Sequence, residues 1–108
     1  MKVFLILIFS LLFLISCKSI SPTAKQNYEK AQISWQKGDK GKAILLIKDA
    51  IKSSPKYYEA YIKLGQFYSE IEKYDKAVLQ FSKASNLKPE KPEPLVLNGE
   101  VYIKKIRF

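Results

Sequence analysis

A 34-residue repeat is the feature that most constrains how this chain can fold. Pro55 and Pro89 lie 34 positions apart. The same spacing joins four further pairs of identical residues: Ala43 and Ala77, Ala50 and Ala84, Gly65 and Gly99, and Tyr68 and Tyr102. Repeats of this length are typical of helix–turn–helix units that stack on one another and present extended surfaces to partners. The period therefore predicts an all-α protein that binds other molecules.

Small and apolar residues recur at helical spacing from residue 24 onward. Gly38 and Asp39 interrupt this pattern. The residues before Pro55 and Pro89 are expected to end helices, because proline disfavours helical geometry in the residue that precedes it. These breaks predict one unit over residues 24–57, a second over 58–91, and the first helix of an incomplete third unit over 92–108.

The second unit resembles the tetratricopeptide repeat (TPR). It carries suitable residues at all eight signature positions of that family: Tyr61, Leu64, Gly65, Tyr68, Ala77, Phe81, Ala84 and Pro89. The first unit is degenerate. It matches at Ala31, Ala43, Ala50 and Pro55, but has Asn27, Lys30 and Ser34 where large side chains are usual. The resemblance implies a short right-handed TPR solenoid of antiparallel helix pairs, with about two and a half repeats; an unrelated amphipathic helical bundle is the alternative.

The resemblance also implies where a partner binds, because the first helix of each unit lines a concave groove in this family. The register places nine residues of the first two units there: Tyr28, Gln32, Trp35, Gln36, Glu59, Ile62, Lys63, Gln66 and Glu70. The third unit adds Val96, Glu100 and Ile103. Aromatic and amide groups beside mixed charges suit an extended peptide or a partner helix. Trp35 is either an interface anchor or a packing residue against the turn between helices, and we favour packing.

The N-terminus has the pattern of a secretory signal. Lys2 precedes a run of 13 residues, Val3 to Ile15, that is apolar except for Ser10. A helix of that length spans about 20 Å, which is shorter than the roughly 30 Å hydrocarbon core of a bilayer. A short basic start, an apolar stretch and a small residue at the end predict a signal peptide over residues 1–16.

Leu14-Ile15-Ser16-Cys17 resembles the bacterial lipobox. The resemblance implies that Cys17 receives a diacylglycerol, that a peptidase cuts before it, and that its new amino group is acylated, with palmitate as a typical chain. Residues 17–23 would then be the acylated cysteine and a polar tether. The alternatives are an ordinary cleaved signal with a chance cysteine, or an uncleaved anchor. Lys18 after the cysteine favours the outer membrane and its periplasmic face in a Gram-negative cell, whereas a Gram-positive origin would give the plasma membrane.

The composition argues against an enzyme and against nucleic-acid binding. The sequence has no histidine and one cysteine, and no catalytic pair, metal-ligand cluster or phosphate-binding glycine loop is recognisable, so we expect no cofactor or metal. The net charge is +9, but 18 of the 19 basic residues are lysines scattered among acidic residues, with Arg107 the exception. This distribution favours solvated helix faces over a nucleic-acid site.

The last segment, Leu95 to Phe108, contains more apolar residues than one neighbouring helix can bury. Its face is covered by a partner chain or by self-association, or the chain is a truncated product. Our main hypothesis is a membrane-anchored lipoprotein that acts as a protein-interaction scaffold in the bacterial envelope, with an envelope protein or peptide as partner. The alternative is an N-terminal anchoring remnant of a larger envelope lipoprotein with a peptidoglycan-binding domain.

Overall fold

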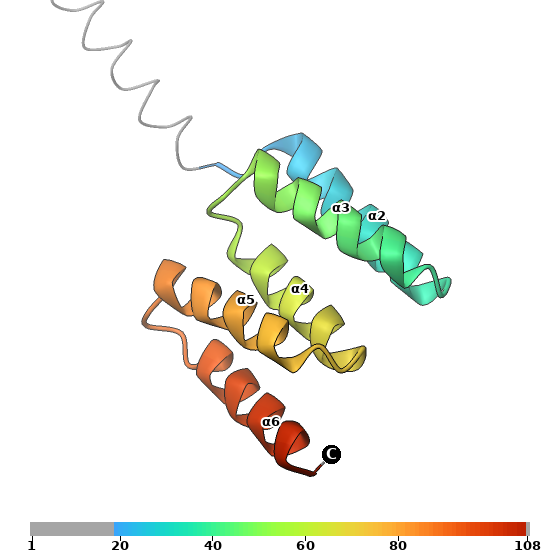
Figure 1. Cartoon of the computed structure of the whole chain (residues 1–108). Helices are drawn as coiled ribbons and strands as arrows, with labels where there is room; N and C mark the ends of the chain where they lie inside the picture. Colours follow the sequence, from blue (N-terminus) through green and yellow to red (C-terminus); the bar gives the residue numbers. More distant parts are fainter. Residues whose placement is uncertain (1–18, 108) are drawn as a thin grey trace, which may run out of the picture.

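The structure is a computed structural model that describes residues 19–107, and these residues form five α-helices without a strand (Figure 1). The helices are α2 (Pro22–Gln36), α3 (Lys40–Ser53), α4 (Tyr58–Glu70), α5 (Tyr74–Leu87) and α6 (Glu93–Arg107). The predicted all-α class is confirmed. None of these described helices is long and apolar enough to cross a membrane. The predicted signal peptide and Cys17 lie outside the described residues.

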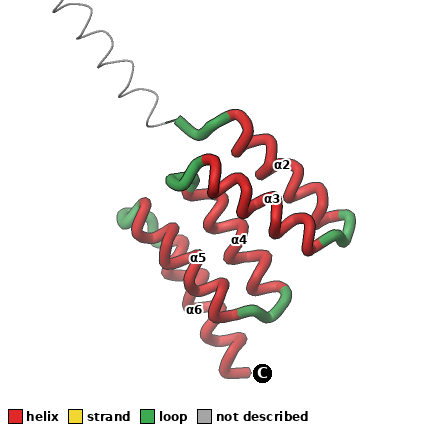
Figure 2. The backbone as a smooth tube through the Cα atoms, turned by 45° about the horizontal axis from the view of Figure 1, so that its top comes forward, coloured by secondary structure: helices red, strands yellow, loops and turns green. Residues whose placement is uncertain are grey.

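Each helix packs against the next one along the chain, and short loops connect them (Figure 2). Helices α2 and α3 form one hairpin, and α4 and α5 form the second (Figure 1). Contacts of α3 with α4 join the two hairpins, and α6 packs on α5. The structure therefore has the stacked hairpins that the repeat predicts, with α6 at the C-terminal edge.

The centre of the fold lies where α4 meets α5. The ring of Phe81 is fully buried, and it lies so close to Gly65 that a Cβ atom there would be less than 3 Å from three of its ring atoms. Ala77 and Ala84 flank Phe81 on α5 and have no exposed surface. Small residues thus let the two helices approach closely around one large ring, which is the packing expected from the signature residues.

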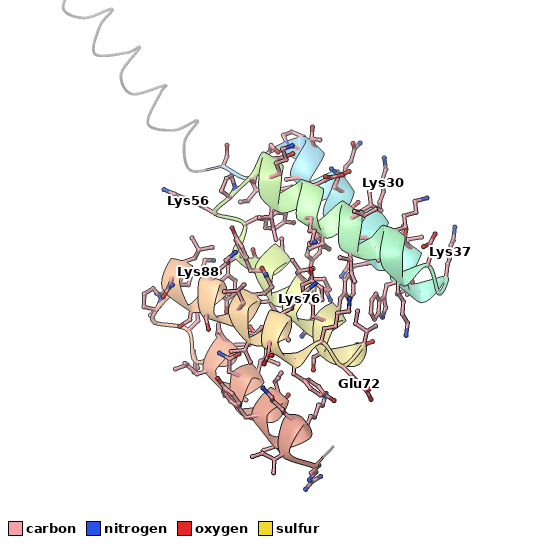
Figure 3. All side chains as sticks on the ribbon, in the orientation of Figure 1. Lys30, Lys37, Lys56, Glu72, Lys76 and Lys88 are labelled. Atoms are coloured by element: carbon pink, nitrogen blue, oxygen red, sulfur yellow. The ribbon has the colours of Figure 1, made fainter. Side chains whose placement is uncertain are left out.

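The two hairpin turns place one residue each in the left-handed backbone region. Gly38 has φ of 89° and Glu72 has φ of 63°. These residues are 34 positions apart, so the repeat conserves the turn geometry although only one of the two is glycine. Figure 3 shows Glu72 at the turn that follows α4.

The chain before α2 is attached to the fold over a longer stretch than the sequence predicted. Helix α2 begins at Pro22, two residues before the predicted start of the first unit, and the Ser21 side chain caps it by accepting from the Ala24 N–H at 3.1 Å. The Ser21 N–H donates to Ser54 Oγ at 3.0 Å, and Ile20 packs on a small core cluster. Ile20 and Ser21, within the predicted tether, therefore contact the fold, and Ser21 supplies the helix cap.

The lysines are spread over the surface. Figure 3 shows labelled lysines on several elements: Lys30, Lys37, Lys56, Lys76 and Lys88. Two ion pairs involve lysines within the described residues: Lys105 with Asp75 at 2.8 Å, and Lys88 with Glu59 at 4.0 Å. The distribution resembles a set of solvated helix faces.

Candidate protein-binding groove

A hollow of about 150 Å³ lies between α2 and α4. Six of the nine predicted groove residues line it: Gln32, Trp35, Gln36, Lys63, Gln66 and Glu70. Phe67 is the seventh lining residue. The helical register of α2 and α4 thus brings most of the predicted residues to one shared surface, as expected when the first helices of successive units lie side by side.

Trp35 forms one wall of this hollow and packs across the boundary between the two units. Its ring stacks on Phe67 with centroids 4.1 Å apart and planes 4° from parallel. The indole Nε1–H donates to Glu70 Oε2 at 3.1 Å, and the ammonium of Lys40 lies 5.2 Å from the ring centroid. The sequence predicts that Trp35 packs against the turn between helices. In the structure it packs on α4 of the next unit instead. Its ring remains partly exposed and can also contact a partner.

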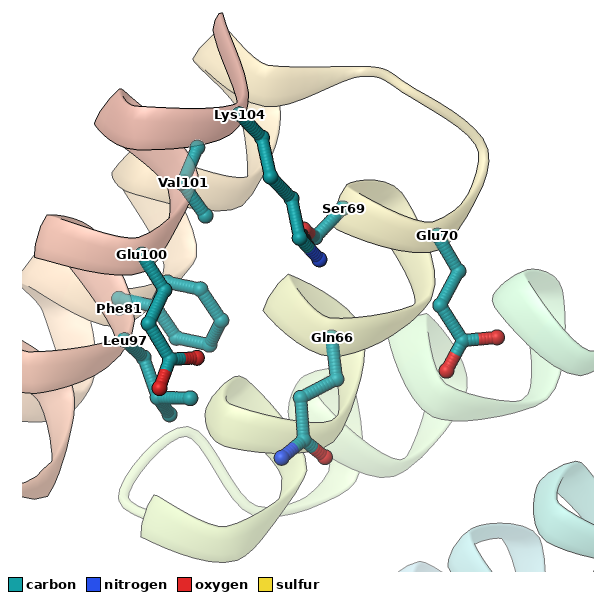
Figure 4. Close-up of a pocket in the computed structure, with 8 residues that line it drawn as sticks. All are labelled: Gln66, Ser69, Glu70, Phe81, Leu97, Glu100, Val101 and Lys104. Carbon is teal, nitrogen blue, oxygen red and sulfur yellow. Dashed lines mark hydrogen bonds between the residues drawn. The ribbon is translucent and has the colours of Figure 1, made fainter. Parts of the chain in front are cut away.

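A second hollow, of about 290 Å³, continues the surface between α4 and α6 (Figure 4). Gln66 and Glu70 line both hollows, so the two hollows adjoin on either side of α4. The α6 side contributes Glu100, which the sequence predicted, and Lys104, which it did not. Lys104 Nζ donates to Ser69 Oγ at 3.5 Å, and Figure 4 shows this side chain reaching from α6 toward α4.

Three predicted groove residues lie elsewhere. Ile62 is only 7% exposed and belongs to the core, because it is rotated about 100° around α4 from its neighbour Lys63. Tyr28 packs against Tyr57 with ring centroids 5.4 Å apart, and the Glu59 carboxylate is 4.0 Å from Lys88. These contacts tie the opposite end of the helices together, away from both hollows.

Two of the predicted residues of the third unit also lie outside the groove. Val96 is 58% exposed and Ile103 is 54% exposed, and neither lines either of the two hollows described above. They lie instead on the outer face of α6, because the α6 residues that face α4 are Leu97, Glu100, Val101 and Lys104.

The residues that sequence reasoning missed are Phe67, Ser69 and Lys104. Phe67 and Ser69 are buried, and Lys104 reaches the groove through its long side chain. The helical spacing could have predicted Phe67, because it follows Lys63 by four residues and residues four apart lie on the same face of a helix. No sequence spacing places Lys104 next to Ser69, since their contact depends on how α6 is oriented on α4 and α5.

Tyrosine hydroxyls at the buried end of the helices are held in the neutral form. Burial raises the pKa of Tyr28 and Tyr57, and the negative charge of Glu59 raises both further. Burial likewise raises the pKa of Tyr58 and Tyr61. The Tyr61 hydroxyl donates to the Pro55 carbonyl at 2.8 Å, which fixes the loop that joins the two units.

The groove offers hydrogen-bonding amides, charges of both signs and one aromatic face. Gln32, Gln36 and Gln66 each carry a donor and an acceptor. Lys63 and Glu70 add opposite charges. Within the described residues, no group of three or more His, Cys, Asp or Glu side chains is placed to hold a metal ion. The groove therefore has the chemistry of a binding surface.

Comparison with known proteins identifies the repeat. Two family models described as tetratricopeptide repeat match the chain, one over residues 24–57 and one over residues 46–79. The chain belongs to the TPR proteins. Members of this family are typically non-enzymatic scaffolds, and TPR repeats typically mediate protein–protein interactions.

Solved structures share the fold. The crystal structure of MamA protein aligns with a TM-score of 0.73 and 28% sequence identity, over 77% of this chain and 45% of MamA. A TPR domain protein from Salinibacter ruber aligns with a TM-score of 0.61 and 19% identity, over 75% of this chain and 93% of that one. Since the alignment with MamA covers 45% of that protein, this TPR chain spans less than half the length of MamA.

A plant protein shares part of the sequence. Cell division cycle protein 27 homolog A from Arabidopsis thaliana is 36% identical over 62 residues, which is 57% of this chain and 9% of that protein. The similarity therefore covers a short stretch of a much longer relative.

Proposed function

We propose that this TPR protein is a lipid-anchored scaffold that holds a peptide segment of an envelope protein in the groove formed by α2, α4 and α6. The observation that carries the proposal is that the two hollows adjoin across α4, where they share Gln66 and Glu70. Adjacent packed helices are about 8–10 Å apart, so the groove crosses roughly 20 Å, which corresponds to about six residues of extended chain.

The side chains of the groove favour an extended peptide over a small molecule. A peptide backbone has a donor and an acceptor at nearly every residue, and Gln32, Gln36 and Gln66 can pair with both. The exposed side of the Trp35 ring supplies an apolar contact for one peptide side chain. Lys63 and Glu70 favour a peptide that carries both an acidic and a basic residue.

The lipobox supports the membrane anchor of this proposal. With Cys17 acylated on its thiol and amino groups, two or three chains would hold the protein firmly, since each buried CH₂ contributes about 0.8 kcal/mol. Ile20 is already docked on the fold. Three residue steps from Cys17 to Ile20 reach at most about 10 Å, so the start of α2 would lie close to the bilayer surface. The periplasmic face of the outer membrane is the proposed location, because Lys18 follows the cysteine.

Site-specific photocrosslinking in intact envelopes tests the groove. A benzoylphenylalanine placed at Gln36 or at Gln66 should give an adduct of the same additional mass at both positions. The matched control is the same residue at Lys83, which is exposed on α5 and does not line either hollow. Adducts of equal yield from Lys83, or different adducts from Gln36 and Gln66, would contradict the groove as the binding surface.

Metabolic labelling with an alkyne fatty acid tests the anchor separately. The protein should be labelled and recovered with outer-membrane fractions, whereas Cys17→Ser should be unlabelled. Equal labelling of both proteins would refute the lipid anchor without affecting the groove.

A further inference from the structure

The two repeat glycines Gly65 and Gly99 occupy equivalent positions but different environments. At Gly65 a Cβ atom would collide with the ring of Phe81 on α5, whereas at Gly99 it would meet nothing within 4 Å. The face of α4 around Gly65 is buried, but the equivalent face of α6 is exposed. In unit two, the second helix α5 covers this face of the first helix. In the described part of the chain, the equivalent face of α6 is left exposed.

The face around Gly99 is strongly apolar. Five large side chains lie on it, within about 60° of Gly99 around the helix axis. Their exposed fractions are 63% for Leu95, 58% for Val96, 52% for Tyr102, 54% for Ile103 and 85% for Ile106. We call these five residues and Gly99 the α6 outer face. An exposed apolar patch of this kind marks an interaction surface.

We propose that the α6 outer face binds the same face of a second copy of this chain, with the two α6 helices antiparallel about a two-fold axis. The residue pattern is self-complementary in that arrangement. When Gly99 lies opposite Tyr102 of the second copy, Leu95 lies opposite Ile106, and the two-fold axis repeats both contacts. A glycine then faces a large ring, as Gly65 faces Phe81 within the chain.

The charges on α6 favour the antiparallel direction. Glu93 is in the first turn, and Lys104, Lys105 and Arg107 are in the last. Lys105 is paired with Asp75 of α5 at 2.8 Å. In the antiparallel pair, Arg107 lies at the end of the second copy that carries Glu93. A parallel pair would instead place these three basic residues next to the same three residues of the second copy, and the repulsion between them would disfavour it.

The exposed area of the α6 outer face lies at the lower end of the range that specific interfaces bury. The exposed fractions of the five side chains correspond to roughly 600 Å² per copy, compared with about 800 Å² per partner in a standard interface. Contacts from the ends of α6 would add to this area.

The pairing leaves the groove accessible. Glu100 and Lys104 line the hollow beside α4 and lie roughly 100° or more around α6 from Gly99. A dimer would therefore carry two separate grooves, and binding to two sites on one partner would be strengthened by avidity.

Cysteine crosslinking of the full-length chain in detergent micelles tests the pairing. Leu95→Cys and Ile106→Cys are made as single variants with different tags, then mixed and oxidised. The two positions are 11 residues apart, or about 16 Å along the helix, so the orientation decides which pairs react. We expect the mixed 95–106 product to exceed the 95–95 and 106–106 products at least tenfold, while the unsubstituted chain reports any background through Cys17.

A second variant gives an independent readout. Ile106→Lys should weaken the dimer at least tenfold in sedimentation equilibrium, because it places a charge opposite Leu95 of the second copy, within the apolar contact. Leu45→Lys is the matched control, since Leu45 is 64% exposed on α3 and should leave association unchanged. Circular dichroism checks that each variant keeps its helices.

Three results would overturn the proposal. They are a folded chain that gives no 95–106 product, dominant 95–95 and 106–106 products, or equal association of the Ile106→Lys and Leu45→Lys variants. A crosslink from position 106 to a protein of different mass, without the dimer, would likewise show that another helix occupies the face.

Discussion

The ring of Trp35 lies flat on Phe67, with centroids 4.1 Å apart, and so joins the last turn of α2 to α4 of the next unit. Stacked aromatic pairs contribute about 0.5–1.5 kcal/mol beyond the burial of their area. In addition, the indole N–H is fixed by Glu70 at 3.1 Å. Trp35 therefore stabilises the contact between units while forming a wall of the groove.

Replacing Trp35 should weaken the fold more than its partial exposure suggests. We expect Trp35→Ala to lower the free energy of unfolding by about 2–3 kcal/mol, because the stack and part of the ring burial are lost. Trp35→Phe should recover about half of that loss by keeping a ring on Phe67. Urea unfolding followed by circular dichroism measures both. A loss below 0.5 kcal/mol in Trp35→Ala, roughly the effect of an ordinary surface substitution, would contradict this role.

Introducing a glycine at one hairpin turn and removing the glycine at the other should change the free energy of unfolding in opposite directions. Glu72 has φ of 63°, a conformation that costs a residue with a Cβ roughly 1–2 kcal/mol, and Gly38 occupies the equivalent position with φ of 89°. Glu72→Gly should therefore raise the free energy of unfolding by about 0.5–1 kcal/mol, and Gly38→Ala should lower it by about 1 kcal/mol. Urea unfolding measures both variants. A change of the same sign in both would show that the backbone conformation does not decide the outcome.

The N-termini of α3 and α5 form a second equivalent pair. Asp39 caps α3 by accepting from the Lys42 N–H at 3.2 Å, whereas Lys73 at the corresponding position makes no side-chain cap. We expect Lys73→Asp to stabilise the protein by about 0.5–1 kcal/mol and Asp39→Ala to destabilise it by about 1 kcal/mol. The control is Lys83→Asp, which changes the charge by the same amount on exposed α5 surface. Equal melting temperatures for Lys73→Asp and Lys83→Asp would rule out capping as the cause.

Stability should fall at alkaline pH. Burial raises the folded-state pKa of Tyr28, Tyr57, Tyr58 and Tyr61 above the ordinary value of 10.0. A raised folded-state pKa means that the folded protein holds these protons more tightly than the unfolded chain. Their contribution is therefore complete below about pH 10 and is lost as the pH rises through the folded-state values.

Tyr58→Phe isolates one of these groups. Among the described residues the Tyr58 hydroxyl has no hydrogen-bond partner, so its removal should change stability near neutral pH by less than about 1 kcal/mol. The variant should, however, lose less stability than the original chain between pH 9 and pH 11. Thermal melts across this range give the comparison, and an unchanged alkaline loss would mean that Tyr58 does not contribute.

The sequence predicted the helices and the register because both depend on local patterns. The 34-residue period and residues such as Gly65 and Phe81 require two helices to approach closely, whatever the rest of the chain does. The groove was predictable only in part, since its lining depends on how neighbouring helices are rotated. Spacing placed Ile62 beside Lys63 on the groove side, but the packing of α4 buries Ile62 in the core. The contact of Lys104 with Ser69 likewise depends on the position of α6.

Gly65 and Gly99 should respond in opposite ways to the same substitution. At Gly65 an added methyl group would collide with the buried ring of Phe81, and α4 and α5 cannot separate without opening the core. We expect Gly65→Ala to lower the free energy of unfolding by about 2–3 kcal/mol, in the range of overpacked cores. At Gly99 the methyl group would meet nothing within 4 Å, so Gly99→Ala should raise it by about 0.5–1 kcal/mol through helix propensity alone. Both variants are best compared in the Ile106→Lys background, where association through α6 does not contribute, and Gly41→Ala on α3 serves as the control for an exposed helical glycine. If Gly65→Ala were as stable as Gly41→Ala, the close approach of α4 and α5 around Phe81 would not be what holds the second unit together.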